Sequence, residues 1–562
     1  MATVYPRRSG AQVLIDQLRI HGTDTIFGVP GESYLAALDA LYAQRNSIRY
    51  VICRQEGGAS YMAEAYGKLT GKPGVCFVTR GPGATNASVG MHTGFQDSTP
   101  MILLVGQVAR EQAEREAFQE IDYRRMYGQM AKWVTQIEDA RRIPEIVSQA
   151  FHRAVNGRPG PVVIALPEDM LVDEVEVADA GPYKVARGAP APEDMASFRE
   201  LLAAAKQPLV ILGGGGWDAK ACADIRAFVE ANHLPVTTAF RNQDLIDNRH
   251  DNFVGDLGLG VNPPLGKRIK ESDLIIAIGP RLGEATTGGY TMFDLPVPAQ
   301  KMVHVHAGAE ELGRVYQATL PINAGMAQFA AAAKAMKPVD ASAWKAGVAE
   351  ARADYLKNIE PTPQPGSANL AEIVGWLNKR LPDDVIVTNG AGNYAGFVHR
   401  FFQYRGFRTQ LAPTNGSMGY GVPSAVAAKI AAPGRTVVSF SGDGCFLMNG
   451  QEFATAVQHG ANVVFIVVDN GMYGTIRMHQ EREYPTRVHG TELKNPDFAA
   501  YARAFGGHGE TVERTADFEA AFERALAAGK PSIIHVKTDA EAITSRITMS
   551  KLREQALAKQ KH

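Results

Sequence analysis

Short apolar runs alternate along the whole chain with longer amphipathic stretches. In the first part of the sequence these runs are TDTIFGV, IRYVI, GVCFVTRG, PMILLVG and PVVIALP. The stretch GASYMAEAYGKLTG, between two of them, is typical of an amphipathic helix. Because strands that alternate with helices are typical of parallel sheets, the pattern predicts an α/β fold with doubly wound parallel sheets.

Two segments interrupt this alternation. Residues 181–194 (GPYKVARGAPAPED) and 358–369 (NIEPTPQPGSAN) carry proline and glycine and lack periodicity. Strand-like runs continue between and after them: PLVILGGGG, PVTTAF, LIIAIG and MVHVHA, then VIVTNGAG, TVVSFSGDG, VVFIVVDNG and SIIHVKTD. Proline-bearing linkers mark domain boundaries, and a chain of 562 residues is too long for one core. We therefore predict three domains, at residues 1–180, 195–340 and 368–562.

Composition narrows the function classes. Lys and Arg total 58 and Asp and Glu total 59, so net charge gives no reason to expect binding to nucleic acid or to an anionic membrane. The longest apolar runs are far shorter than the roughly 20 residues that span a bilayer. Cys53, Cys76, Cys222 and Cys445 form no CxxC pair, and the N-terminal residues lack a signal-peptide pattern. These features predict a cytoplasmic protein with reduced thiols.

The third block carries the most specific motif. Asp443 and Asn470 each follow a strand-like run, and each has a glycine after it. Ligands of doubly wound sheets lie beyond the carboxyl ends of the strands. One carboxylate and one amide oxygen suit Mg²⁺ bound to a diphosphate, and nearby glycines let backbone N–H groups approach the phosphates. Asp, Asn and Gly also end strands in ordinary turns, so the prediction depends on the two motifs together.

The two motifs match the diphosphate–magnesium motif of thiamine diphosphate enzymes, which usually ends in Asn-Asn; here Asp469 takes the first position. Over nearly its whole length the chain resembles the acetolactate synthase/pyruvate decarboxylase-like family, with a pattern like that of acetolactate synthase large subunits. The resemblance implies a pyrimidine-binding, a central and a diphosphate-binding domain. It also implies thiamine diphosphate and Mg²⁺, with the metal held by Asp443, Asn470 and the Met472 carbonyl.

Glu56 follows the strand-like run RYVIC and opens the predicted helix. In the family a glutamate at this place hydrogen-bonds the coenzyme's aminopyrimidine and activates it. A carboxylate at a helix N-terminus is also favoured by the helix dipole, so the position alone does not decide its role. With the family match, a catalytic role is the preferred interpretation. TRGPGATN resembles the loop over the pyrimidine, through Pro82 and Asn86.

Other segments match the rest of the coenzyme site. LAPTNGSMGYG resembles the segment in which Met418 is an apolar wedge beneath the coenzyme and Gly416 offers its carbonyl. The loop TNGAGNYAG aligns with diphosphate contacts through Gly392, Asn393 and Tyr394. The remaining candidates flank the metal ligands: Gly442, Gly444, Cys445, Tyr473 and Gly474. Because the family builds this site from two chains, the resemblance implies a homodimer or homotetramer.

Four residues bear on the reaction. Phe118 and Gln119 in REAFQEID resemble a synthase motif, which favours carboligation of a 2-oxo acid with an aldehyde or ketone; Gln119 could equally be a solvated helix residue. Glu32 falls where pyruvate decarboxylases have a catalytic Asp, and is also a normal residue for the start of a helix. His479 aligns with the gating Trp of the synthases, which indicates a more polar substrate.

Three functions remain open at this stage. A carboligase is the preferred hypothesis. A decarboxylase that releases an aldehyde is supported by Glu32 but lacks the family's His-His pair, and a non-catalytic binding subunit is disfavoured by the intact motifs. In the second block, residues 212–218 and 279–288 resemble stretches that hold FAD in relatives. The departure at Arg281-Leu282-Gly283 leaves FAD as an open alternative.

Overall fold

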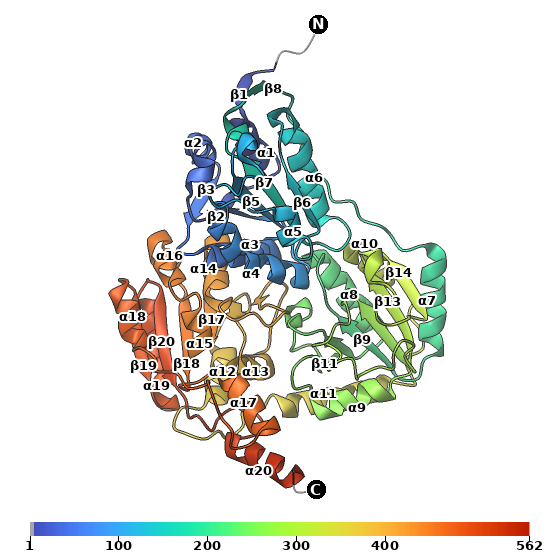
Figure 1. Cartoon of the computed structure of the whole chain (residues 1–562). Coiled ribbons are helices and arrows are strands. Elements are labelled where there is room, and N and C mark those ends of the chain that lie inside the picture. The colour runs from blue at the N-terminus through green and yellow to red at the C-terminus, as the bar shows by residue number, and fades with distance from the viewer. Residues whose placement is uncertain (1–4, 561–562) are drawn as a thin grey trace. The chain divides into compact units, whose positions relative to one another are not determined.

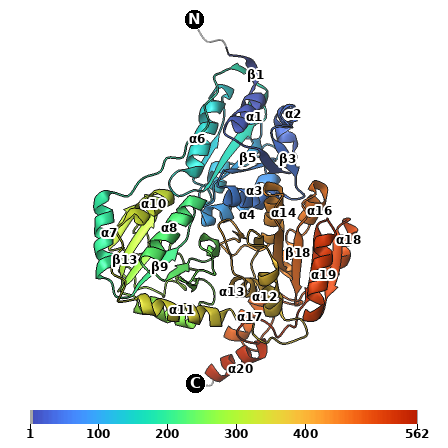
Figure 2. The same cartoon turned by 180° about the vertical axis from the view of Figure 1, so that it is seen from behind.

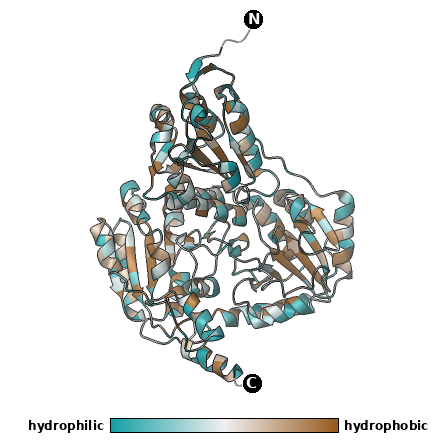
Figure 3. Ribbon diagram, viewed as in Figure 1, coloured by the Kyte–Doolittle hydropathy of each residue, from teal (hydrophilic) through white to brown (hydrophobic). Residues whose placement is uncertain are grey.

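The computed structural model describes residues 5–560 (Figures 1 and 2). In this part of the chain three six-stranded parallel sheets are flanked by helices. A small antiparallel sheet pairs β1 (Arg7–Ser9) with β8 (Glu174–Glu176). The strands are mostly apolar, whereas the helices alternate between apolar and polar faces (Figure 3). The predicted α/β class with doubly wound parallel sheets is confirmed.

The first sheet has the order β3-β2-β4-β5-β7-β6. Its strands are β2 (Thr25–Gly28), β3 (Arg49–Ile52), β4 (Gly74–Val78), β5 (Met101–Gln107), β6 (Trp133–Gln136) and β7 (Pro161–Pro167). The helices of this region are α1 (Gly10–Ile20), α2 (Leu35–Ala43), α3 (Glu56–Thr70), α4 (Pro82–Asp97), α5 (Tyr123–Tyr127) and α6 (Ile143–Val155). Apolar residues of α1, α2 and α6 pack on the sheet in one core, and α3 and α4 lie side by side away from that core (Figure 1).

The third sheet repeats the strand order of the first, as β16-β15-β17-β18-β20-β19. Its strands are β15 (Ile386–Asn389), β16 (Gln410–Leu411), β17 (Val437–Gly442), β18 (Val464–Asp469), β19 (His508–Val512) and β20 (Ser532–Lys537). The helices of this region are α12 (Leu370–Arg380), α13 (Asn393–Phe401), α14 (Gly421–Ala431), α15 (Asp443–Leu447), α16 (Glu452–His459), α17 (Gly474–Glu483), α18 (Phe498–Ala504), α19 (Thr515–Ala527) and α20 (Met549–Lys559). Since β17 and β18 pair in parallel, their carboxyl ends lie at the same edge of the sheet.

The second sheet has a different order, β11-β10-β9-β12-β13-β14. Its strands are β9 (Pro208–Leu212), β10 (Val236–Thr238), β11 (Phe253–Asp256), β12 (Leu274–Ile278), β13 (Lys301–His306) and β14 (Leu320–Asn323). Its helices are α7 (Pro192–Ala204), α8 (Ala219–Ala231), α9 (Pro263–Glu271), α10 (Met326–Ala335) and α11 (Lys345–Asn358). The order reverses between β9 and β12, the place where such sheets bind dinucleotides. There Gly214 and Gly279 pack backbone against backbone, because a Cβ on Gly214 would lie 2.0 Å from the Gly279 carbonyl oxygen.

The chain forms two compact units. The first contains the described residues up to Ala186 together with Val426–Ala432 and Asn449–Ala461, and the second contains the rest. Helix α16 therefore belongs to the first unit, although it lies in sequence between β17 and β18 of the second. The predicted domain boundaries stay predictions. Between residues 5 and 560, no helix combines the length and the apolar composition needed to cross a bilayer.

Candidate functional site

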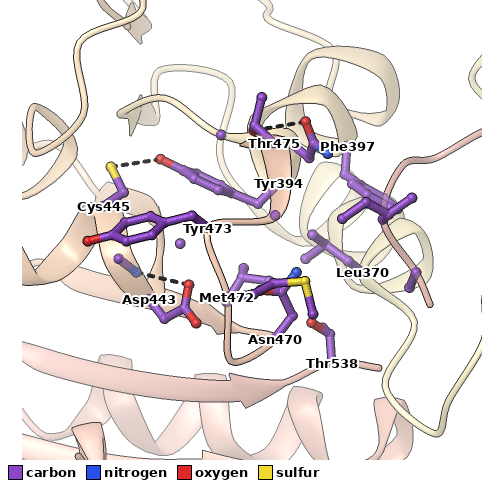
Figure 4. Close-up of a pocket in the computed structure, with 18 of the residues that line it drawn as sticks. Leu370, Tyr394, Phe397, Asp443, Cys445, Asn470, Met472, Tyr473, Thr475 and Thr538 are labelled. Atoms are coloured by element: carbon purple, nitrogen blue, oxygen red, sulfur yellow. Dashed lines mark hydrogen bonds between the residues drawn. The ribbon is translucent and has the colours of Figure 1, made fainter. Parts of the chain in front are cut away.

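The carboxyl ends of β17 and β18 open on a cavity of about 250 Å³. The pairing of Gly442 with Val468 brings the residues that follow each strand to neighbouring positions. Asp443 and Asn470 both line this cavity, and Figure 4 shows them with Met472 around its lower wall. We call it the Asp443 cavity. Its lining includes all three residues predicted to hold the metal, which are Asp443, Asn470 and, through its backbone carbonyl, Met472.

The Asp443 cavity also gathers every predicted coenzyme contact of the third block. These residues are Gly392, Asn393, Tyr394, Gly416, Met418, Gly442, Gly444, Cys445, Tyr473 and Gly474. Two of the glycines are needed for close packing, since a Cβ on Gly442 would lie 2.9 Å from the Tyr394 ring and one on Gly444 would lie 2.5 Å from the Tyr473 ring. Tyr394 donates its hydroxyl hydrogen to Cys445 Sγ at 3.3 Å (Figure 4). The roles of these residues stay predictions.

The carboxylate of Asp443 is buried and forms no ion pair with a described residue. Its Oδ1 accepts a hydrogen bond from the Gly444 N–H at 2.9 Å, and its Oδ2 accepts one from Asn495 Nδ2 at 2.8 Å. Asn495 Nδ2 also donates to Asp469 Oδ1 at 2.8 Å, so one amide bridges two carboxylates. Burial, with the nearby Asp469 charge, raises the pKa of Asp443 above its usual range. A cation in this cavity would stabilise the ionised form.

Asp469 replaces the Asn that is usual in the motif, and neighbouring groups stabilise its negative charge. His535 Nε2 lies 2.8 Å from Asp469 Oδ2, and the Gly471 N–H donates to Asp469 Oδ1 at 2.9 Å. Burial acts to raise the pKa of Asp469, but these hydrogen bonds outweigh it and lower the pKa below its usual range. Neither Asn495 nor His535 was predicted from the sequence, because both come from segments with no recognisable motif.

The donor set fits Mg²⁺ bound together with phosphates. It consists of the Asp443 carboxylate, the Asn470 amide and the Met472 carbonyl, which accepts from the Gly474 N–H at 2.9 Å and keeps a second lone pair. Mg²⁺ typically takes one or two carboxylates and leaves its other positions to water and phosphate oxygens. Among residues 5–560 there is no cluster of three His, Cys, Asp or Glu side chains that would instead indicate an all-protein site.

Glu56 is the first residue of α3, as predicted. Its Oε2 accepts a hydrogen bond from Asn86 Nδ2 at 2.9 Å. Asn86 lies on α4, the helix that begins at Pro82. A Cβ on Gly83, the next residue, would lie 3.4 Å from Glu56 Oε1. The structure thus brings Glu56 and Asn86 into contact, beside the first turn of the helix that begins at Pro82, and leaves Oε1 of Glu56 without a hydrogen bond to Asn86.

A second carboxylate, Glu452 of α16, holds the backbone just before Glu56. Its Oε1 accepts from the N–H groups of Arg54 at 3.1 Å and Gln55 at 2.9 Å, and its Oε2 accepts from Thr455 Oγ1 at 2.6 Å. The side chain is fully buried, and burial raises the pKa of Glu452 to about 7. Sequence reasoning missed this residue because hydrogen bonds between distant segments leave no local pattern.

Glu32 and Phe118 meet around Arg80. Arg80 Nη2 lies 3.3 Å from Glu32 Oε1, its Nη1 lies 3.0 Å from Glu168 Oε2, and its Nε donates to the Phe118 carbonyl at 3.0 Å. Glu32 begins a short 3₁₀ helix, Glu32–Tyr34, which agrees with the helix-start interpretation. The ring of Phe118 is exposed.

The structure also places the other two candidate substrate residues, Gln119 and His479. Gln119 does not lie on a helix; it is a loop residue with φ of 65°, and a Cβ on Gly81 would meet its Cβ at 2.7 Å. The alternative of a solvated helix residue is therefore wrong. His479 lies on α17 beside Arg482, and it lines a different cavity from that of Asp443.

Comparisons with known proteins agree with this geometry. Residues 8–126 match the N-terminal TPP binding domain of thiamine pyrophosphate enzymes, residues 195–333 match the central domain, and residues 390–536 match the C-terminal TPP binding domain. The chain is 30% identical to the acetolactate synthase isozyme 2 large subunit of Escherichia coli, over 94% of this chain and 96% of that protein. It is 31% identical to an acetolactate synthase of Arthrospira platensis, over 94% of each chain.

The Glu452 contact predicts a pH effect on stability. The pKa of Glu452 is about 7 in the folded chain, against 4.5 ordinarily, so the folded state holds a proton that the unfolded state releases. The stabilising effect of this proton is full below pH 4.5 and is lost as the pH rises to about 7. Glu452→Gln keeps an acceptor for the Arg54 and Gln55 N–H groups but cannot ionise. Relative to this variant, the wild type should lose free energy of unfolding between pH 5 and pH 8, measured by urea denaturation.

Glu111→Gln is the matched control, since Glu111 is exposed in the same unit. Its pH dependence should follow that of the wild type. Parallel curves for the wild type and Glu452→Gln would show that Glu452 is not protonated preferentially in the folded state.

Proposed function

This chain belongs to the thiamine pyrophosphate enzyme family, and we propose that it is a carboligase that depends on thiamine diphosphate and Mg²⁺. It would break the C1–C2 bond of a 2-oxo acid, release CO₂, and join the remaining acyl carbon to the carbonyl carbon of an aldehyde or ketone. The observation that carries the proposal is the pairing of β17 with β18, which puts Asp443 and Asn470 in one glycine-lined cavity. The names of the relatives, acetolactate synthases, support the carboligase outcome.

The residues of the Asp443 cavity would bind rather than react. Asp443, Asn470 and the Met472 carbonyl would hold Mg²⁺. Gly442, Gly444 and Gly474, which have no side chains, would let the backbone lie close to the diphosphate. This assignment gives the buried Asp443 carboxylate the cation that it otherwise lacks. The proposed domains are pyrimidine-binding at 1–180, central at 195–340 and diphosphate-binding at 368–562.

Glu56 would handle the proton. When bound, thiamine diphosphate supplies a nucleophilic carbon and an electron sink for breaking the bond next to a carbonyl. Glu56 would hold a proton at Oε1, while Asn86 fixes its Oε2, and would share that proton with the aminopyrimidine. Glu452 keeps the start of α3 in place by binding the preceding N–H groups. The Glu56 carboxylate is thus not needed as the cap of its own helix.

We propose a cytoplasmic homodimer or homotetramer in which one subunit supplies Glu56 and another supplies Asp443. FAD remains an alternative that the absorption spectrum of the purified protein tests directly, since a bound flavin absorbs visible light. The glycine-rich turns at the ends of β9 and β12 lie where a dinucleotide would bind.

The products identify the reaction. The purified protein, with thiamine diphosphate and Mg²⁺, is offered a panel of 2-oxo acids with and without aldehydes, and products are read by mass spectrometry. A 2-hydroxy ketone, or a 2-hydroxy-3-oxo acid where a second 2-oxo acid is the acceptor, is the expected result for a carboligase. A free aldehyde as the sole product would identify a decarboxylase, and an absence of turnover with every substrate would argue for a binding subunit.

Glu56→Gln should reduce turnover by about 100-fold or more, because the amide cannot share a proton. Thiamine diphosphate should remain bound, since the substitution leaves the Asp443 cavity intact. The measurements are kcat on the substrate that the panel identifies and coenzyme affinity by calorimetry. Glu176→Gln, at an exposed position of the same unit, is the control and should retain wild-type turnover. Near-normal turnover of Glu56→Gln would refute the assigned role.

Asp443→Ala should instead weaken the binding of thiamine diphosphate with Mg²⁺. The loss should exceed the roughly 10–100-fold that removal of an outer-shell partner costs a metal site. Calorimetric titration measures it, with Asp384→Ala, an exposed carboxylate of the same unit, as the control. Unchanged affinity in Asp443→Ala would remove the metal site from the proposal.

The same two variants test the subunit arrangement. If each site takes Glu56 from one subunit and Asp443 from another, a mixed dimer of Glu56→Gln and Asp443→Ala chains contains one intact site and one doubly altered site. Coexpression should therefore restore activity that neither variant has alone. Continued inactivity of the purified mixed dimer would show that both residues act within one chain.

A further inference from the structure

A second cavity, of about 460 Å³, lies next to the Asp443 cavity. Gly392, Asn393 and Thr475 line both cavities, and Thr475 Oγ1 donates to Asn393 Oδ1 at 3.0 Å within this shared wall (Figure 4). The rest of its lining comes from Phe240 and Arg241, the end of β11 and the loop after it, Asn358 at the end of α11, the helices α13 and α17, and residues 544–547. A ligand in this cavity would therefore lie directly beside a ligand in the Asp443 cavity.

The second cavity is strongly basic. Four arginines line it against a single acidic residue, Asp256: Arg241, Arg400, Arg482 and Arg546. We call it the arginine cavity. Burial raises the pKa of Asp256 to about 7, although the nearby Arg546 charge acts to lower it. The balance of charge favours an anionic ligand.

Arg400 and Arg546 are held by neutral groups. Arg400 donates from Nε to the Asn358 carbonyl at 2.8 Å and from Nη1 to the Ser545 carbonyl at 2.7 Å. Arg546 donates from Nη2 to Asn358 Oδ1 at 2.8 Å. Neither guanidinium forms an ion pair with any residue that the structure describes. Each keeps N–H donors that these contacts do not use.

This arrangement is unfavourable without an anion. Burial, together with the neighbouring Arg546 charge, lowers the pKa of Arg400 to about 10, which reflects partial desolvation and repulsion of like charges. On the opposite side of α17 the chain balances such charges differently, since Arg477 and Arg553 both pair with the buried Glu481. Asp256 is the nearest source of negative charge for Arg546, but it forms no ion pair with either arginine. Two guanidinium groups fixed by carbonyl oxygens, with N–H donors left over, are arranged to bind a carboxylate or phosphate through paired hydrogen bonds.

We propose that Arg400 and Arg546 bind a second anionic group of the substrate, a carboxylate or phosphate at the end remote from its reacting carbonyl. The inference rests on the proposed function for the identity of the ligand as a substrate, whereas the anion site itself rests on the arginine cavity alone. The cavity, at about 460 Å³, leaves room for a substrate longer than a small 2-oxo acid such as 2-oxobutyrate. The position of His479 in the same cavity fits a polar substrate portion.

The first test measures anion binding without turnover. Inorganic phosphate and succinate are titrated separately into the full-length protein in low-salt buffer, followed by calorimetry. Arg400→Gln and Arg546→Gln should each weaken binding of the preferred anion at least about tenfold, as expected for the loss of a charge-assisted hydrogen bond. Arg487→Gln is the control, because Arg487 is exposed and lies outside the cavity. Equal affinity in all four proteins, or no binding by the wild type, would overturn the anion site.

The second test assigns the anion to the substrate. In the same proteins we measure kcat/KM for three substrates: a 2-oxo acid with a second carboxylate, a 2-oxo acid with a terminal phosphate, and 2-oxobutyrate. The value for each of the first two is divided by the value for 2-oxobutyrate. Both cavity variants should lower this ratio at least tenfold for one of these two substrates, which also distinguishes carboxylate from phosphate. An unchanged ratio in variants that have lost anion binding would show that the site serves a separate anion and would overturn the substrate assignment.

The two tests separate this inference from the proposed function. Anion binding that depends on Arg400 in a protein without turnover would leave the anion site in place and contradict the proposed function. Turnover that is unaffected by substitution of either arginine would support the proposed function and contradict the anion site. Arg400→Lys keeps the charge but lacks the planar fork, so it should bind the anion more weakly than the wild type and more tightly than Arg400→Gln. Thermal unfolding of each variant confirms that the protein is folded.

Discussion

The parallel pairing of β17 with β18 is the constraint on which the candidate site depends. Both strands are almost wholly buried, so their register is fixed by the apolar side chains on both faces. Because of this register, Asp443 and Asn470 lie close together at one edge of the sheet. Burying a carboxylate there is costly unless a cation compensates it, and the single bridging amide of Asn495 does not supply that charge. A metal ion bound at this edge of the sheet would therefore offset the cost of burying the Asp443 carboxylate.

The first and third sheets have the same strand order. In each, polar residues just beyond the carboxyl ends of the strands carry the candidate chemistry: Glu56 and Asn86 in one sheet, Asp443 and Asn470 in the other. The second sheet, with its different order, contributes the loop after β11 to the arginine cavity. Similar scaffolds therefore present different chemistry, because the loops rather than the strands differ.

The sequence predicted correctly those strands and motifs that depend on a few consecutive residues. Buried strands such as β5 and β18 read as continuous apolar runs, and the motifs around Asp443 and Asn470 lie directly after such runs. The strands that it missed are short or partly exposed, for example β16 with two residues and β6, which is half-buried throughout. These strands have too few apolar positions to stand out from a loop, and tertiary pairing alone makes them strands.

The residues that support the site escaped prediction for a related reason. Asn495, His535 and Glu452 each act on a segment far away in sequence, and their own neighbourhoods carry no motif. Gln119 shows the converse case, in which a helix was one alternative but a left-handed loop conformation was adopted. Close packing of Gly81 against Gln119 accounts for that loop, and such packing between separate segments cannot be read from either one alone.

The membership of α16 in the first unit has a consequence for synthesis of the protein. The ribosome finishes most of that unit at Ala186, but the carboxylate that accepts the Arg54 and Gln55 N–H groups emerges only with Asn449–Ala461. During translation, the Arg54 and Gln55 N–H groups therefore lack their Glu452 acceptor until most of the chain has been made. A fragment cut at the first proline-rich linker would lack the same helix permanently, so the unit cannot be isolated intact by simple truncation.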